Sequence, residues 1–246
     1  MSAYYNEIDP YAAQWLRNLI IAGHIADGVV DTRSIEDVQP DDLREFTQCH
    51  FFAGIGVWSY ALRRGGWPDD RPVWTGSCPC QPFSEAGEGV GFADERHLWP
   101  HFHHLIKECG PASVIGEQVA SKAAAAWIDL VHADLEGVGY TFGAVPFPSA
   151  SVGAPHNRDR CYWVAHSNDP ERRAEEPTWH NRVRTAPEWN ESNCYAWKRL
   201  HDEDWEDFAA SLRSFPDGVA PRLGRLRAYG NAINAEQARI FIECIA

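Results

Sequence analysis

The sequence predicts an α/β protein with a mostly parallel sheet, because short strands alternate with helices over residues 1–165. Alternation of this kind produces a sheet whose two faces are both covered by helices. The 246 residues are enough for one substantial core and a small appended lobe. A hydrophobic content of 44% and a charged content of 23% are typical of a folded, soluble protein.

The first helix is expected over residues 12–22, because Trp15, Leu16, Leu19 and Ile20 share one helical face. The other elements follow from short apolar runs and from further stretches with helical spacing. Strands are expected at 29–30, 48–52, 73–75, 113–115, 140–145 and 161–165, and helices at 57–64, 98–109, 123–135 and 235–245.

The pattern changes at His166. Residues 166–214 are polar, rich in tryptophan and without clear hydrophobic periodicity. We interpret this stretch as a small separate lobe, after which the chain regains order near residue 229.

The net charge of −13 argues, taken alone, against a nucleic-acid partner, because phosphate binding depends on lysine and arginine. It does not exclude a basic groove on an otherwise acidic body. Residues 219–230 carry Arg222, Arg225 and Arg227 with no acidic residue, so such a patch is available. The alternative is that these arginines are simply solvated.

The cysteine pattern and the N-terminus indicate a cytoplasmic protein. The seven cysteines include no C-x-x-C pair, which favours reduced thiols. No apolar run is long enough to span a membrane, and the first residues lack the features of a signal peptide. We expect no metal site, because His97, His101, His103 and His104 fall on more than one helix face without fixed acidic or thiol partners.

Cys80 follows the strand at 73–75 and lies in the hexapeptide Pro79-Cys80-Gln81-Pro82-Phe83-Ser84. Open α/β sheets place reactive groups in loops at the carboxyl ends of their strands. A single cysteine there is equally consistent with an ordinary buried thiol. The hexapeptide, however, resembles the catalytic motif of the DNA (cytosine-5) methyltransferases, and it is a highly specific string.

Further segments resemble other motifs of the same family, in the family's spacing. They are residues 52–56, 91–96, 116–119, 154–160, 215–217 and 229–233. The resemblance covers nearly the whole chain except 166–214. It implies a Rossmann-like S-adenosylmethionine-dependent methyltransferase fold with a catalytic and cofactor-binding domain at 1–165, a target-recognition region at 166–218 and a return to the first domain at 219–246.

The order of the motifs departs from that of the family. The family normally runs from the cofactor loop through two acid-bearing strands to the catalytic cysteine, but residues 52–56 lie too close to Cys80 to leave room for them. Residues 5–12 resemble the segment of the first missing strand, and 28–31 that of the second. We interpret this as a local permutation, the alternative being that 1–45 is an unrelated leader. The permutation predicts a strand near 3–6 beside strand 48–52, with Glu7 and Gly54 together.

The resemblance implies methyl transfer to carbon 5 of cytosine in double-stranded DNA, after the base has been flipped out of the helix. Cys80 would be the nucleophile that adds to carbon 6. Glu117 would bind ring nitrogen 3 and the exocyclic amine. Arg160, with Arg158 beside it, would hold the base carbonyl and favour the thiolate.

The resemblance also assigns the other contacts. For the cofactor, Glu7 would bind the ribose hydroxyls, Asp31 the adenine amine and Phe52 the adenine face, while Gly54, Gly56 and Asn231 would shape the methionine end. The residues expected to contact the substrate are Gln81, Ser84, Arg96, Arg225 and Arg227. We expect a monomer of phage or prophage type that acts without an obligate protein partner.

Four positions depart from the family pattern. His50 stands where the family usually has Asp, Val57 where it has a second Gly, Gln118 where it has Asn and His156 where it has Gln. The first two bear on cofactor affinity. Two alternatives therefore stay open: an RNA cytosine methyltransferase that acts on tRNA, and a DNA-binding relative that no longer turns over.

Overall fold

The computed structural model describes residues 2–79, 98–120, 122–154, 158–173 and 232–245. The backbone groups into two units, Met1–Glu175 with Arg227–Ala246, and Glu176–Leu226. Every described residue belongs to the first unit. The first unit thus continues past residue 165, whereas the predicted target-recognition role of 166–218 stays a prediction.

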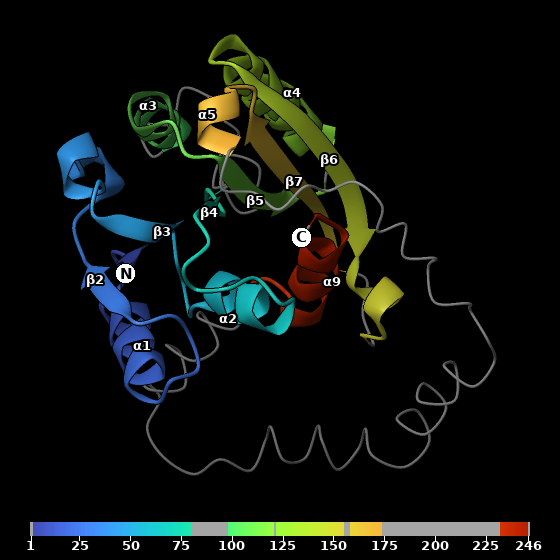
Figure 1. Ribbon diagram of the computed structural model, residues 1–246. Helices are drawn as coiled ribbons and strands as arrows, with labels where there is room; N and C mark the ends of the chain where they lie inside the picture. The colour runs from blue at the N-terminus through green and yellow to red at the C-terminus, as the bar shows by residue number, and fades with distance from the viewer. Residues whose placement is uncertain (1, 80–97, 121, 155–157, 174–231, 246) are drawn as a thin grey trace, which may run out of the picture. The chain divides into compact units, whose positions relative to one another are not determined.

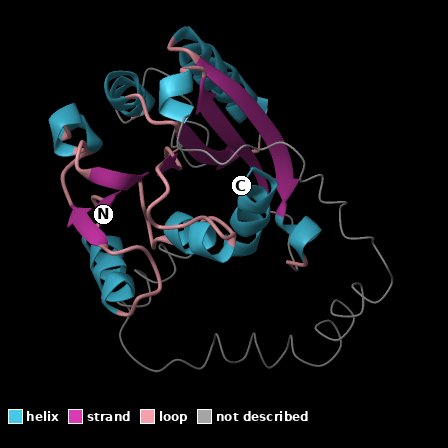
Figure 2. Ribbon diagram, viewed as in Figure 1, coloured by secondary structure: helices cyan, strands magenta, loops and turns pink. Residues whose placement is uncertain are grey.

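Seven strands form one sheet in the order β2-β1-β3-β4-β5-β7-β6 (Figures 1 and 2). The neighbours from β2 to β5 are parallel, and β7 is antiparallel to both β5 and β6. The predicted α/β class with a mostly parallel sheet is therefore confirmed. The strands are β1 (Ser2–Asn6), β2 (Gly28–Asp31), β3 (Phe46–Phe51), β4 (Val73–Gly76), β5 (Ser113–Val119), β6 (Tyr140–Pro148) and β7 (Asp159–Ser167).

Helices cover both faces of this sheet (Figure 1). On one face lie α1 (Pro10–Ile21), α2 (Val57–Arg64) and α9 (Ala235–Ile245), and on the other lie α3 (Trp99–Cys109) and α4 (Lys122–Gly137). Shorter helical turns are η1 (Ile35–Asp37), η2 (Pro40–Asp42), η5 (Ser149–Val152) and α5 (Pro170–Arg173). Among the described residues, none of the helices combines the length and apolarity that crossing a membrane demands.

Large aromatic side chains fill the core between the sheet and α3. Phe51 packs against Trp74 and Phe102, with ring centroids 5.0 and 4.9 Å apart. Trp99 contacts Trp163 edge-on, and both are almost completely buried. Full burial of such a side chain contributes about 1.5–3 kcal/mol, so these contacts fix α3 against the strands that bear the site.

The N-terminal strand lies where the permutation predicts it. β1 pairs in parallel with β3, with Ala3 opposite Gln48 and Asn6 opposite Phe51. β2 then pairs with the other edge of β1. Residues 1–45 are therefore an integral part of the sheet, and the interpretation of this segment as an unrelated leader is wrong.

The first helix starts earlier than the apolar pattern indicates, at Pro10, because Asp9 caps it. The Asp9 carboxylate accepts the backbone N–H groups of Tyr11 and Ala12 at 2.8 and 3.0 Å. A side-chain oxygen at this position satisfies amides that have no partner within the helix. The helix then buries Ala12, Ala13 and Leu16 under the strands.

β5 is longer than the apolar run at 113–115 indicates. It continues through Gly116, Glu117 and Gln118, which are all buried although two of them are polar. β7 pairs with this extension, with Tyr162 opposite Glu117. Polar residues in a strand are poor sequence signals, because only tertiary partners make their burial possible.

Gly28 tests the packing of the permuted strands. A Cβ atom at this position would lie 1.9 Å from the carbonyl oxygen of Ala3, so β1 and β2 must separate to admit it. We expect Gly28→Ala to lower the free energy of unfolding in urea by about 1–3 kcal/mol, the usual cost of overpacking.

The matched control is Gly143→Ala, in the edge strand β6, where an added Cβ meets nothing within 4 Å. It should change stability by no more than roughly 0.5 kcal/mol. Equal effects of the two substitutions would contradict the close packing of β2 on β1.

Candidate active site

The carboxyl ends of β1, β2 and β3 are joined by backbone hydrogen bonds just beyond the strands. The Glu7 N–H donates to the Asp31 carbonyl at 2.9 Å, and the Ala53 N–H donates to the Asn6 carbonyl at 3.0 Å. Ligands of open α/β sheets bind at this edge. The three segments that carry the predicted cofactor residues are thus held together there.

The Glu7 side chain completes this junction. One carboxylate oxygen accepts the Gly54 N–H at 2.7 Å, and the other accepts the Asp9 N–H at 2.8 Å. The predicted proximity of Glu7 and Gly54 is confirmed by this contact. Hydrogen bonds to a charged group are stronger than neutral ones, so the carboxylate is held in one orientation.

The loop between β3 and α2 has an unusual backbone. Phe52, Gly54 and Gly56 have φ angles of 51°, 55° and 80°. A bulky residue with positive φ is uncommon, and it persists only where the surroundings enforce it. Phe52 lies edge-on to Phe102, with centroids 6.1 Å apart. At Gly56 a Cβ would lie 3.0 Å from the Leu16 side chain, so α1 packs directly against this loop.

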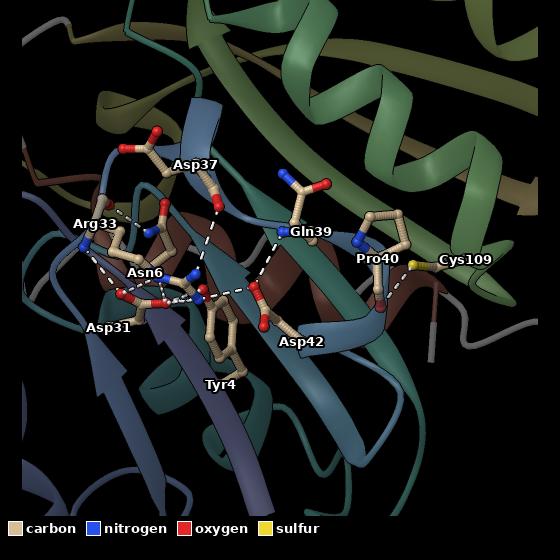
Figure 3. A network of polar contacts seen from close by, with 9 residues as sticks. All are labelled: Tyr4, Asn6, Asp31, Arg33, Asp37, Gln39, Pro40, Asp42 and Cys109. Carbon is tan, nitrogen blue, oxygen red and sulfur yellow. Dashed lines mark hydrogen bonds and ion pairs between the residues drawn. The ribbon is translucent and has the colours of Figure 1, made fainter.

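The Asp31 carboxylate follows β2 and is already engaged (Figure 3). It accepts the Tyr4 hydroxyl at 2.7 Å, the Arg33 N–H at 2.9 Å and the Arg33 guanidinium Nη2 at 2.7 Å. Burial acts to raise the pKa of Asp31, but the hydrogen bonds from Arg33 and Tyr4 outweigh it and hold the pKa below its usual range. Sequence reasoning missed both partners, although the spacing from Asp31 to Arg33 is typical of an Asx turn.

Glu117 and Arg160 form a second cluster on β5 and β7. Arg160 Nε lies 2.6 Å from Glu117 Oε1, with side chains that are only 16% and 8% exposed. Burial raises the pKa of Glu117, against the opposing effects of Arg160, the Ser77 hydroxyl and Arg158. A carboxyl group in such a setting is suited to sharing a proton with a bound base.

Residues just before Cys80 contact the same cluster. Ser77, which is hydrogen-bonded to Glu117, also accepts the Trp58 indole N–H at 3.0 Å. The Gln118 amide donates to the Cys78 carbonyl at 3.3 Å. The Gln118 side chain, at the position where the family pattern has Asn, therefore connects β5 to the segment that leads into Cys80.

Arg158 lies beside the pair and reaches the C-terminal part of the chain. Its Nη2 donates to the Ala232 carbonyl at 2.9 Å, next to the predicted cofactor residue Asn231. The remaining predicted residues lie outside the described part of the chain: Cys80, Gln81, Ser84, Arg96, Arg225, Arg227 and Asn231, together with His156.

His50 replaces an acid at the end of β3 with a neutral, buried ring. Its Nδ1 lies 2.8 Å from the Thr75 hydroxyl, and the ring stacks on Tyr5 with centroids 4.9 Å apart. Burial lowers the pKa of His50 to about 3, so the imidazole carries no charge at neutral pH. Val57, the other departure near the loop, is the first residue of α2.

The fold is of the Rossmann-like methyltransferase class, with a glycine loop and two acid-bearing strands at one edge of a mostly parallel sheet. A family model described as C-5 cytosine-specific DNA methylase matches residues 61–209, and the chain belongs to that family. The match begins within α2, downstream of β1, β2 and β3.

Relatives of known type match shorter stretches. The chain is 30% identical over 104 residues to the type II methyltransferase M.NgoBI of Neisseria gonorrhoeae, covering 41% of this chain and 33% of the relative. It is 31% identical over 99 residues to M1.ScrFI of Lactococcus lactis subsp. cremoris, covering 39% and 25%. The chain thus matches a third or less of the length of these relatives.

The similarity to one solved structure covers more of the chain, at a lower sequence identity. The S. pombe Dnmt2 methyltransferase is 15% identical, with a TM-score of 0.48, covering 100% of this chain and 97% of that one.

The Glu117–Arg160 pair makes a prediction for stability. Arg160→Ala leaves a buried carboxyl without its countercharge, which typically costs about 3–5 kcal/mol. The pKa of Glu117 then rises further. An acid whose folded-state pKa is raised above about 4.3 loses stability as pH rises. The loss in free energy of unfolding relative to wild type, measured in urea, should therefore be small near pH 4 and reach its full size at pH 8.

The control is the double variant Glu117→Gln with Arg160→Ala, in which no carboxyl is left without its countercharge. Its loss of stability relative to wild type should shrink rather than grow from pH 4 to pH 8, because only wild type then carries the carboxyl whose raised pKa lowers stability as pH rises. A deficit of Arg160→Ala that is constant between pH 4 and pH 8 would show that the pair is not coupled as its distance indicates.

Proposed function

We propose that this chain transfers a methyl group from S-adenosylmethionine to carbon 5 of cytosine in double-stranded DNA. The observation that carries the proposal is the buried Glu117–Arg160 pair, which contacts the segment leading into Cys80 through Ser77. Membership of the C-5 cytosine-specific DNA methylase family supports the same reaction.

Each residue of the base-binding end has a distinct task in this proposal. Cys80 adds as a thiolate to carbon 6 of the flipped base, which makes carbon 5 nucleophilic. Glu117 shares a proton with ring nitrogen 3, and its raised pKa supports that task. Arg160 holds the base carbonyl and orients Glu117. Carbon 5 takes the methyl group from the sulfonium, whose carbon–sulfur bond breaks to leave a neutral thioether. Loss of the carbon-5 proton then expels Cys80 as a thiolate and restores the ring.

The cofactor end fits the proposed methyl donor at the ribose. S-adenosylmethionine, when bound, supplies an electrophilic methyl group on a sulfonium. Glu7 is fixed by Gly54 and Asp9 in the position from which a carboxylate can accept two ribose hydroxyls. Phe52 would pack on the adenine, and the positive φ angles of Gly54 and Gly56 would let the loop backbone come close to the methionine part of the cofactor.

The proposal extends to the partners of the chain. Residues 166–218 would read the DNA sequence through arginine and tryptophan side chains, with Arg225 and Arg227 nearby on the phosphates. The chain would act as a monomer without an obligate protein partner, in the cytoplasm of a bacterial host.

The covalent step is tested by trapping. A DNA duplex with 5-fluorocytosine at the target has no proton on carbon 5 to lose. Elimination of Cys80 is then blocked after methyl transfer, so the chain should form a covalent adduct in the presence of S-adenosylmethionine. Mass spectrometry should locate the adduct at Cys80, and Cys80→Ser should form none and abolish methyl transfer.

Cys244→Ser is the matched control, because Cys244 is an exposed thiol of α9, and it should trap like wild type. A fluorinated tRNA should not be trapped. Capture of tRNA in place of DNA would favour the RNA methyltransferase, and an adduct that survives Cys80→Ser would overturn the assignment of the nucleophile.

The role of Glu7 is tested by cofactor binding. Glu7→Ala removes the proposed carboxylate-to-diol contact and should weaken S-adenosylmethionine by roughly 1.5–3 kcal/mol, the range for hydrogen bonds to charged groups. Isothermal titration calorimetry measures the dissociation constant directly. Glu7→Gln, which keeps an acceptor for Gly54, should lose less.

Glu45→Ala serves as the control, since Glu45 is an exposed carboxylate of the same N-terminal segment. It should leave the dissociation constant unchanged. An unchanged constant for Glu7→Ala would place the ribose elsewhere.

A further inference from the structure

Arg33 has no part in any step of the proposed reaction, yet it binds the carboxylate of Asp31, which is the residue assigned to the adenine amine. Its backbone N–H and its side chain both bind the Asp31 carboxylate, with Nε 2.9 Å and Nη2 2.7 Å from Oδ2 (Figure 3). The Asp31 side chain is only 13% exposed as a result of this cover and of its place beside Tyr4.

The acceptor capacity of Asp31 is used up by these contacts. A carboxylate offers about four lone-pair sites. Oδ1 accepts the Arg33 N–H at 2.9 Å, and Oδ2 accepts the Tyr4 hydroxyl and Nη2, both at 2.7 Å. The fourth donor, Nε, is shared between the two oxygens, 2.9 Å from Oδ2 and 3.2 Å from Oδ1. An adenine amine can therefore reach this carboxylate only in exchange for one of its present donors.

Arg33 is the donor that has another acceptor within reach. Its Nη2 also lies 2.9 Å from Asp42 Oδ2, and its Nη1 donates to the Asp37 carbonyl at 3.4 Å. Asp42 is held in turn by the Gln39 N–H at 3.0 Å. The Arg33 side chain is 45% exposed, so its guanidinium can rotate toward η2 without leaving the protein surface. Tyr4, by contrast, is almost completely buried.

We propose that Arg33 is an affinity- and specificity-determining residue of the cofactor site, which competes with the adenine amine for Asp31 and shifts onto Asp42 when the cofactor binds. This inference rests on the proposed function, because it requires an adenine at the carboxyl end of β2. Arg33 lowers cofactor affinity, and Asp42 offsets part of that effect by accepting the displaced guanidinium.

The competition predicts opposite effects for two substitutions in one network. The dissociation constant of S-adenosylhomocysteine is measured by calorimetry for each variant. Arg33→Met keeps the apolar stem but no donor, so binding should tighten about fivefold, in line with a partly exposed ion pair. Asp42→Asn still accepts the Gln39 N–H but holds the guanidinium less well, so binding should weaken about threefold.

Arg44→Ala is the charge control. Arg44 pairs with Asp41 at 2.7 Å rather than with Asp31, and the two side chains are 75% and 83% exposed. This variant removes the same charge as Arg33→Met and should leave the dissociation constant unchanged. If Arg33→Met and Arg44→Ala tightened cofactor binding equally, net charge alone would explain the effect, and the proposal would be overturned.

A 6-oxo analogue of S-adenosylhomocysteine, which lacks the exocyclic amine, tests where Arg33 acts. The ratio of the analogue's dissociation constant to that of S-adenosylhomocysteine should be about fivefold larger in Arg33→Met than in wild type. The reason is that the amine can donate fully to the Asp31 carboxylate only when Arg33 does not occupy it. This ratio is internal to each variant, so it is independent of any loss of stability.

The outcomes separate the inference from the function on which it rests. Weaker binding in both Arg33→Met and Asp42→Asn, or an unchanged analogue ratio, would show that the network is only scaffolding and would overturn the inference. Absence of binding by the wild-type chain would overturn the proposed function itself.

Discussion

The structure depends on the parallel pairing of β1 with β3. This pairing sets Asn6 opposite Phe51, so that the chain leaves both strands at the same level of the sheet. Glu7 then meets Gly54, and the bond of 2.7 Å between them closes the junction. A shift of the register by one residue would turn Tyr5 out of the core and Glu7 away from the loop. The position of Glu7 beside Gly54 therefore depends on which strands pair in the sheet, and not on the order of these strands along the chain.

The same sheet edge carries the base-binding end. β4 and β5 continue the parallel order from β3, so Ser77, just after β4, and Glu117, near the end of β5, lie at the same sheet edge as Glu7 and Asp31. β7 enters in the antiparallel direction and brings Arg160 to Glu117 from the opposite side. Arg158, two residues away, extends the connection to Ala232. One edge of the sheet therefore positions both groups of side chains.

Much of this arrangement follows from residue patterns. The helical stretches predicted at 57–64 and 235–245 coincide with α2 and α9, and the resemblance of residues 5–12 and 28–31 to family segments indicated the acids of the cofactor end. The extension of β5 through Glu117 could not be found, because its polar residues are buried only by the pairing with β7. The occupancy of Asp31 by Arg33 and Tyr4 was also missed, since Tyr4 reaches Asp31 only after β1 and β2 have paired.

The most direct test of the account is a crystal structure with S-adenosylhomocysteine bound. The account predicts that both ribose hydroxyls lie within about 2.7–3.2 Å of the Glu7 carboxylate, which still accepts the Gly54 N–H. A ribose held by a carboxylate from residues 57–79, with Glu7 turned away from it, would contradict the claim that the N-terminal strand supplies the missing acid of the permuted site.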